Sequence, residues 1–244
     1  MAKWRVGTSG WVYPHWRGVF YPHDLPQREW FAYYARYFDT VEINNTFYRL
    51  PSEETFDMWR TQAPAGFVYA VKANRYITHI RRLRDCAEPL ERFLARVRRL
   101  GTALGPILYQ LPPRWKPNLD RLSSFLALLP TGLIHVMEFR DPRWFIPEVF
   151  DLLQKHGVGF CIYHMPEQET PLAVTADTVY IRFHGTGVLY GGSYPDENLL
   201  LWTRRIRAWI QQGYHVYVYF NNDAYGHAVR NALTLKNMLS NAFL

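Results

Sequence analysis

The amino-acid sequence predicts an α/β protein, a single (β/α)8 TIM barrel over residues 1–244. Three observations predict it: eight short runs rich in β-branched or aromatic residues, segments of helical apolar spacing between them, and a length near the roughly 250 residues typical of this fold. The first turn, GTSGW, lacks the glycine spacing of dinucleotide-binding proteins. This disfavours the alternative of an open doubly wound sheet.

The predicted strands and helices alternate along the chain. We expect strands at 4–9, 40–44, 67–72, 107–111, 135–140, 158–163, 179–184 and 214–221. Apolar spacing and capping residues predict helices at 28–38, from 53 after the N-cap Ser52, at 90–100 before Gly101, from Pro147 to just before Gly157, at 199–212 and at 228–239. The sixth crossover, HMPEQETPLAVTAD, has no helical period, so we expect an irregular connection there.

Composition excludes several classes of protein. With 48% hydrophobic and 20% charged residues, the chain is not intrinsically disordered. Two cysteines, Cys86 and Cys161, are too few for a disulfide scaffold or a cysteine-rich zinc module. No apolar run approaches the roughly 18 residues of a membrane span, and the first residues do not resemble a signal peptide. We therefore expect a cytoplasmic protein with no membrane partner.

The charge balance favours anionic partners. The formal net charge is +7, and the basic residues are 23 Arg and 5 Lys. Aromatic residues make up 17% of the chain, and arginines together with aromatics line the grooves that bind single-stranded nucleic acid. The same composition also arises when arginine usage follows the coding genome and most aromatics lie in the core. Both interpretations remain open from composition alone.

Polar side chains gather where the predicted strands end, which is where barrel enzymes carry their chemistry. Side chains in a strand alternate between its two faces, so Val41 and Ile43 against the helices place Glu42 and Asn44 inside. The same alternation places inside the barrel Glu138 with Arg140, and Arg182 with His184; the other strand ends carry Ser9, Lys72, Gln110, Tyr163 and Asn221. An active or binding site explains this set, and a buried structural ion network is the alternative.

The loop after the seventh strand adds a possible phosphate site. Its sequence, RFHGTGVLYGGSY, places Gly185 and Gly187 directly behind Arg182 and His184. Loops after strands seven and eight of this fold often bind phosphate, and glycines let backbone N–H groups approach an anion. Asn221 precedes a helix whose N-terminus also favours an anion.

An ordered series of motifs resembles a known family: GTSGW, FYP at 20–22, VEINNTFYR at 41–49, VKANRYITH at 71–79, LGPILYQLPP at 104–113, MEFRDPRW at 137–144, RFHG at 182–185 and YFNND at 219–223. Together they look like the domain of unknown function 72, or YecE-like, family, over almost the whole chain. The resemblance implies a TIM barrel and no settled activity. Members resemble xylose-isomerase and endonuclease-IV type barrels in fold, and nucleic-acid binding has been proposed on that ground. Relatives usually carry an Asp after the sixth strand, where this chain has His164.

The first functional hypothesis is a metal-independent enzyme acting on an anionic, phosphate-bearing substrate, with no cofactor. Glu42 and Glu138 would be its acid/base pair and His184 a proton carrier. Lys72 would help to hold the anion or form a Schiff base. The remaining substrate-binding candidates are Ser9, Asn44, Gln110, Arg140, Arg182, Gly185, Gly187 and Asn221. We expect these groups to converge on one pocket.

Two alternatives come from other classes. The first is a phosphodiesterase of the endonuclease-IV kind, with a divalent metal on Glu42, Glu138, His164 and His184, although the neighbouring cations would compete with the metal. The second is a nucleic-acid-binding module without chemistry. It would use the arginines after the third strand and nearby rings: Arg75, Arg81, Arg82, Arg84, Tyr76, His79, Trp115 and Trp144. A solvated basic loop would look the same in sequence.

Overall fold

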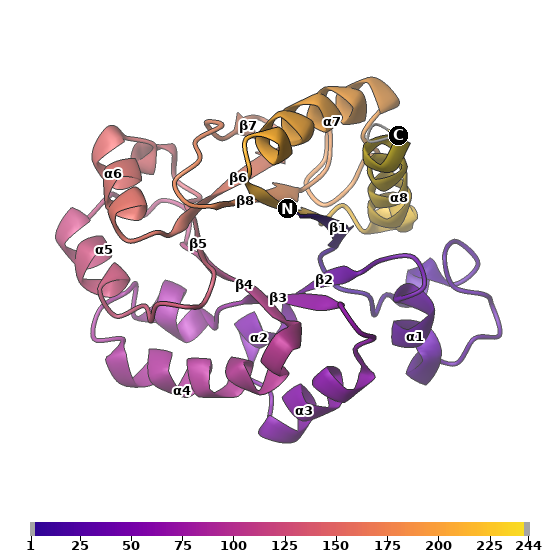
Figure 1. Ribbon diagram of the computed structural model, residues 1–244, viewed down its shortest axis with the longest axis horizontal. Helices are drawn as coiled ribbons and strands as arrows, with labels where there is room; N and C mark the ends of the chain where they lie inside the picture. Colours follow the sequence, from indigo (N-terminus) through magenta and orange to yellow (C-terminus); the bar gives the residue numbers. More distant parts are fainter. Residues whose placement is uncertain (1–2, 242–244) are drawn as a thin grey trace. The chain divides into compact units, whose positions relative to one another are not determined.

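The computed structural model describes residues 3–241, in which parallel strands alternate with helices (Figure 1). The chain divides into two compact units. The first contains the residues up to Glu42, Tyr163–Glu169 and the chain from Val179 onward, and the second contains Ile43–Ile162 and Thr170–Thr178. The organisation of the chain as a single domain stays a prediction.

The strands of the first unit are neighbours in the order β1 (Trp4–Thr8), β9 (His215–Phe220), β8 (Thr178–Phe183) and the end of β6 (Gly159–Met165). Strands β1 and β9 pair in parallel, from Trp4 opposite Val216 to Thr8 opposite Phe220. A parallel bridge between Ser9 and Glu42 joins the end of β1 to β2 (Thr40–Ile43). The carboxyl ends of these strands therefore lie together in the first unit.

Three α-helices belong to the first unit: α1 (Trp30–Tyr34), α7 (Asp196–Gln211) and α8 (His227–Asn241). Figure 1 shows α7 beside α8, and α8 also contacts β1. Short 3-10 turns lie at Pro14–Trp16, Gln27–Glu29 and Ala224–Gly226. Before α1 the chain is held by aromatic packing, since the rings of Tyr21 and Trp30 stack with centroids 4.7 Å apart.

The second unit begins its sheet with the first residues of β6 and continues through β5 (His135–Glu138), β4 (Leu104–Gln110) and β3 (Val68–Lys72), all parallel. Gln110 lies opposite Glu138, which aligns the ends of β4 and β5. Its helices are α2 (Asn45–Tyr48), α3 (Glu53–Gln62), the π-helix Tyr76–Ile80, α4 (Ala87–Val97), the 3-10 turns Arg98–Ala103 and Pro142–Trp144, α5 (Leu119–Leu126) and α6 (Pro147–Lys155). Helix α3 packs on α4, and α5 packs on α6.

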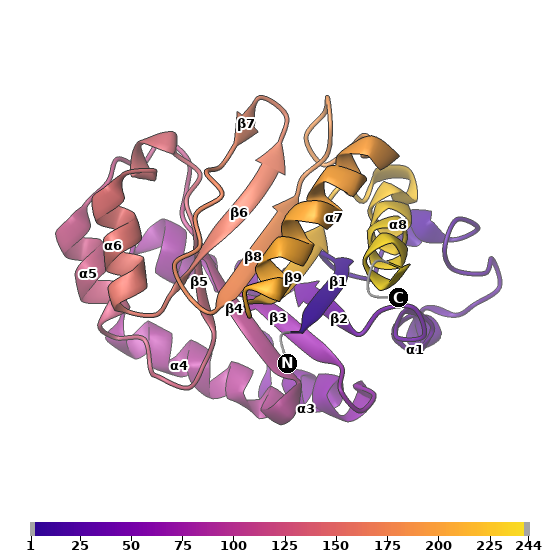
Figure 2. The ribbon, with the colours of Figure 1, turned by 45° about the horizontal axis from the view of Figure 1, so that its top comes forward.

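All eight predicted strands are present in the described residues, and most ends differ from the prediction by one to three residues. The irregular sixth crossover is also confirmed. Strand β6 turns back into the two-residue strand β7 (Gln168–Glu169), paired antiparallel with His164 opposite Glu169, and no helix precedes β8 (Figure 2).

The helix predictions need three corrections. The predicted helix 28–38 is shorter, a 3-10 turn followed by α1; beyond Tyr34 the chain continues as turns, with Arg36 N bonded to Tyr33 O and Tyr37 N to Tyr34 O. Ser52 stands at the N-cap of α3, but its hydroxyl contacts the Thr55 hydroxyl and caps no helix N–H. Helix α5 was not predicted at all, and the Asn118 side chain caps it by accepting from Arg121 N.

None of the described helices combines the length and the apolar character that crossing a membrane requires.

Candidate functional site

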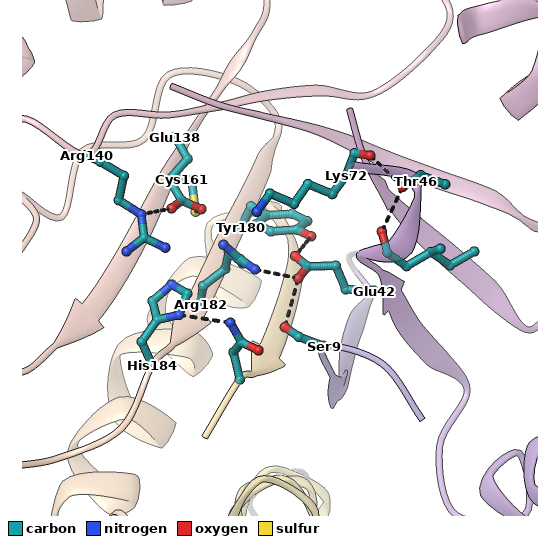
Figure 3. A network of polar contacts seen from close by, with 12 residues as sticks. Ser9, Glu42, Thr46, Lys72, Glu138, Arg140, Cys161, Tyr180, Arg182 and His184 are labelled. Carbon is teal, nitrogen blue, oxygen red and sulfur yellow. Dashed lines mark hydrogen bonds and ion pairs between the residues drawn. The ribbon is translucent and has the colours of Figure 1, made fainter. Parts of the chain in front are cut away.

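Glu42 is the centre of a buried polar cluster in the first unit (Figure 3). Its carboxylate accepts hydrogen bonds from Ser9 Oγ at 2.8 Å, Tyr180 Oη at 2.5 Å and Arg182 Nη2 at 2.7 Å. Burial of the Tyr180 ring, with Glu42 beside it, holds the pKa of that phenol well above its usual value. Tyr180 therefore acts as a neutral hydrogen-bond donor to the carboxylate.

This arrangement changes the roles expected of Glu42 and Arg182. A carboxylate has about four acceptor positions, and three of those on Glu42 are occupied by fixed donors. Arg182 is 1% exposed and ion-paired to Glu42, so its guanidinium is not presented to bulk solvent. A buried, paired cluster of this kind is expected both for an active site and for the structural ion network considered above, so the choice between them stays open. Glu42 is suited to orienting Arg182, and less to exchanging a proton itself.

His184 and Asn221 form a second pair in the first unit. His184 is fully buried, and its Nδ1 lies 3.2 Å from Asn221 Nδ2. An amide nitrogen only donates, so in this contact Nδ1 is the acceptor and Nε2 is the ring nitrogen that carries the proton. The rings of Tyr163 and Tyr190 meet the imidazole edge to face, at 6.1 and 5.7 Å. Asn221 and the two tyrosine rings thus hold the His184 ring in one orientation.

The glycine loop is built around Tyr194. Gly185 has φ +107°, and a Cβ there would lie 2.0 Å from Gly191 O, so only glycine fits. Its N–H donates to Tyr194 Oη at 3.2 Å, which corrects the expectation that this N–H is available to an anion. Gly187 is exposed with φ +72° in open space, and its part in binding stays a prediction.

His164, which stands where relatives usually carry Asp, joins the β7 hairpin to this loop. Its Nδ1 lies 2.8 Å from Tyr194 Oη, and its Nε2 lies 3.3 Å from Glu169. Burial lowers the pKa of His164, and the Glu169 carboxylate acts in the opposite direction. The imidazole therefore links two loop segments of the first unit.

Asp223 is a candidate site residue that the sequence reasoning passed over. It follows Asn221 and Asn222 at the end of β9, and burial raises the pKa of its carboxyl. His15 approaches it, with Nε2 3.5 Å from Asp223 Oδ2. A carboxyl with a raised pKa is suited to general acid/base chemistry. Its place in the run NND, directly after a strand end, was the available signal.

The second unit contains a separate carboxylate, Glu138, at the end of β5. It is fully buried and paired with Arg140 Nε, two residues further along. The Cys161 thiol lies 3.7 Å from its other oxygen, a neighbour that the sequence reasoning did not propose. Lys72, at the end of β3, places its ammonium 4.1 Å from the centre of the Phe47 ring. These groups remain candidates for catalysis and anion binding.

Asn44 and Gln110 also lie in the second unit, each partly exposed just after or at the end of its strand. The two buried clusters just described belong to different units, and their convergence on one pocket stays a prediction.

Within residues 3–241, no three His, Cys, Asp or Glu side chains are grouped so that they could hold a metal ion together.

The predicted nucleic-acid residues fall into two groups. Trp144 is fully buried, stacked on Phe139 at 4.9 Å, and its Nε1 donates to Trp115 O, so its prediction as a base-stacking residue is wrong. Arg75 is exposed, while Tyr76 and His79 are partly buried. Burial, and then Lys72 and other nearby cations, lower the pKa of His79 to about 4, so its ring is neutral near pH 7.

The thiol of Cys86 lies under the same segment. It is buried, its Sγ contacts the carbonyl oxygens of Ile77 at 3.8 Å and Arg84 at 3.4 Å, and burial raises its pKa to about 11. Cys86 therefore supports the segment from below and is protonated near neutral pH.

Comparison with solved structures defines the class of protein. A DUF72 family protein from Thermotoga maritima MSB8 is 29% identical, with a TM-score of 0.89 over 98% of this chain and 99% of that one. A second, from Enterococcus faecalis V583, is 19% identical with a TM-score of 0.84 over 97% and 95%, and supports the fold alone. The fold is a (β/α)8 barrel, as predicted.

The family follows from the sequence. The model of the protein family of unknown function DUF72 matches residues 5–243, and the chain belongs to that family. UPF0759 protein YecE of Escherichia coli K12 is 33% identical over 141 residues, which span 57% of this chain and 49% of YecE. UPF0759 protein YunF of Bacillus subtilis 168 is 22% identical over 96% of this chain and 94% of YunF.

Proposed function

We propose that this protein is an enzyme that acts, without a metal ion, on a small phosphate-bearing substrate at the carboxyl ends of its strands. The observation that carries the proposal is the pair of buried, oriented groups in the first unit, Arg182 fixed by Glu42 and His184 fixed by Asn221. Burying charged groups is unfavourable, so a set concentrated at the catalytic end of this fold favours a function over stability alone.

Each group has a chemical role in this proposal. Arg182 offers a planar guanidinium to the substrate anion, and Glu42 keeps it in place. His184 supplies or accepts a proton at Nε2, and Asp223 is the carboxyl suited to the opposite transfer. The guanidinium on Glu42 also occupies a carboxylate that a metal ion would otherwise use. That Glu138, Arg140 and Lys72 act on the same substrate remains part of the proposal.

Calorimetric titration with inorganic phosphate and with sulfate tests the anion site. We expect saturable binding that weakens more than tenfold in Arg182→Lys, because lysine keeps the charge and loses the planar fork. Arg204→Ala removes an exposed charge from α7 and is the control. Equal weakening in both variants, or no saturable binding at all, contradicts the proposal.

A second assay tests catalysis. Phosphorylated small molecules are incubated with the protein in the presence and absence of EDTA, and products are followed by phosphorus NMR. We expect turnover that EDTA does not change and that His184→Gln abolishes. Loss of turnover in EDTA would favour the metal-dependent phosphodiesterase instead. Lys72→Ala and Glu138→Gln, assayed alongside, test whether the second unit takes part.

A further inference from the structure

The segment that follows β3 has an unusual backbone. Residues Tyr76–Ile80 form a π-helix, and Arg82, Leu83 and Asp85 directly after it have φ of 49°, 65° and 49°. Non-glycine residues seldom adopt positive φ, and both π-helices and such strained positions concentrate at binding and catalytic sites. The backbone of this segment is therefore typical of a ligand-binding site.

A cavity of about 150 Å³ lies beside the π-helix. It is lined by apolar Leu50, Ile77, Pro89 and Phe93 and by polar Asn74, Tyr76 and Arg92. An apolar cavity of roughly 150 Å³ holds one benzene-sized ring. Size and lining together suit one flat aromatic ring with polar groups on its edge.

The polar part of the wall is held in place before any ligand arrives. Asn74 Nδ2 donates to Thr46 O at 2.9 Å, and its Oδ1 accepts from Tyr76 N at 2.9 Å. Arg81 Nε donates to Tyr76 Oη at 3.0 Å, with its guanidinium over the tyrosine ring. A wall with fixed side chains loses little conformational freedom when it binds a ring.

The segment from Arg75 to Arg84, which supplies Tyr76 and Ile77 to the cavity wall, is rich in arginine. Arg75 and Arg82 are exposed, and with Arg121 they form no ion pair to a carboxylate within residues 3–241. Arg121 also reaches Arg82, with Nη1 3.5 Å from its carbonyl oxygen. Two exposed pairs, Arg84 with Asp85 and Arg92 with Glu88, neutralise only part of the charge. Several cations on the segment that lines a ring-sized cavity suit a chain of phosphates more than a single phosphate.

We propose that this face of the second unit binds single-stranded nucleic acid, with one unstacked base in the cavity and the adjacent phosphates on Arg75, Arg82 and Arg121. A duplex keeps its bases stacked and paired, so it cannot fill the cavity. The proposal is independent of the small-anion site proposed above, since the two use different residues.

Fluorescence anisotropy tests this proposal. The probes are labelled 12-nucleotide single strands, one RNA and one DNA, and a DNA duplex of equal length. We expect a single strand to bind more tightly than the duplex, and its affinity to fall roughly tenfold to twentyfold from 50 to 200 mM salt for three phosphate contacts. A single strand that binds more tightly than the duplex supports the proposal whether RNA or DNA is preferred. Equal binding of duplex and single strand overturns it.

Variants separate the cavity from the charges. Arg75→Ala with Arg82→Ala should weaken every strand and flatten the salt dependence. Leu50→Trp fills the cavity and Tyr76→Ala removes part of its wall; each should weaken single strands about tenfold without changing the salt dependence. The control pair Arg28→Ala with Arg204→Ala removes two exposed charges from the first unit. Thermal melts check that each variant folds. Equal loss in the control pair, or no loss in both cavity variants, overturns the proposal.

Discussion

The two buried carboxylates at strand ends, Glu42 and Glu138, are held in opposite ways. The partners of Glu42 are remote in sequence, since Arg182 is 140 residues away and Tyr180 is 138. Glu138 takes its guanidinium from Arg140, two residues along, and has the Cys161 thiol on the adjacent strand. The first cluster therefore requires several strands to be assembled, whereas the second ion pair needs only the end of one strand.

The two sets of donors also differ in chemistry. Both oxygens of Glu42 accept from strong donors, Ser9 and Arg182 on one and Tyr180 on the other. Glu138 has Arg140 on one oxygen and the Cys161 thiol, a weak donor and weak acceptor, on the other. The described contacts of the two carboxylates thus differ in the strength of the donors that make them.

The largest expected effect is that of Glu42→Gln. Either orientation of the amide places its NH2 group against a donor, and Arg182 loses its charged partner while fully buried. Breaking a buried ion pair in this way should lower the free energy of unfolding by about 3–5 kcal/mol, measured by urea denaturation. A loss below about 1 kcal/mol would mean that the cluster is open to water.

Tyr180→Phe should come next, because it removes one donor from Glu42 and leaves the charge pair intact. Hydrogen bonds to charged groups contribute about 1.5–3 kcal/mol, and the loss in urea denaturation should fall in that range. Combined with Glu42→Gln, the two losses should be less than additive, since both act on one network. Fully additive losses would mean that Tyr180 and Glu42 contribute to stability independently, which contradicts the prediction.

Glu138→Gln is the matched substitution in the second unit and should have a smaller effect. Arg140 also loses its charged partner, but its side chain is 8% exposed where that of Arg182 is 1%, so water can solvate part of its charge. The amide oxygen can still accept from Arg140 while the NH2 group faces the Cys161 sulfur. We expect a loss of about 1–2 kcal/mol in the same denaturation experiment. If Glu138→Gln and Glu42→Gln destabilise equally, the contrast between the two units is wrong.

The last prediction concerns the pH dependence of stability and compares two histidines. Burial lowers the pKa of both, but His164 has the Glu169 carboxylate beside it, while Lys72 and Arg75 lower the pKa of His79 further, to about 4. Below pH 6.5 the unfolded chain gains a proton that the folded His79 does not, so stability falls from about pH 6.5 to about pH 4. His79→Phe should flatten this part of the stability profile more than His164→Phe. The reverse order would contradict the assignment.

Strand alternation explains which parts of the site could be predicted. It placed Glu42, Arg182 and His184 on one face, and all three are buried. Tyr180 has the same parity as Arg182, so the same rule also predicts that its side chain points inward. The pairing of Glu42 with Arg182 could not be predicted from that rule, because it depends on which strands become neighbours across 140 residues.

Helices and rings show a different limit. The spacing of Leu122, Phe125 and Leu126 would have indicated helix α5, but eight residues give little periodicity to count. Trp144 follows a strand end, as a ligand-binding ring often does, yet stacking on Phe139 buries it. Position along the chain predicts the end of the barrel at which a ring lies, and packing decides whether the ring reaches solvent.

The buried Cys86 thiol can serve as a probe of local opening in the second unit. With a pKa of about 11, roughly one thiol in a thousand is ionised at pH 8, and the carbonyls of Ile77 and Arg84 lie over the sulfur. A thiol reagent can therefore reach the sulfur only when the π-helix and the positive-φ turn Arg82–Asp85 open locally. The labelling rate of Cys86 reports how often that happens, and an oligonucleotide seated beside Tyr76 should slow it without carrying any label of its own.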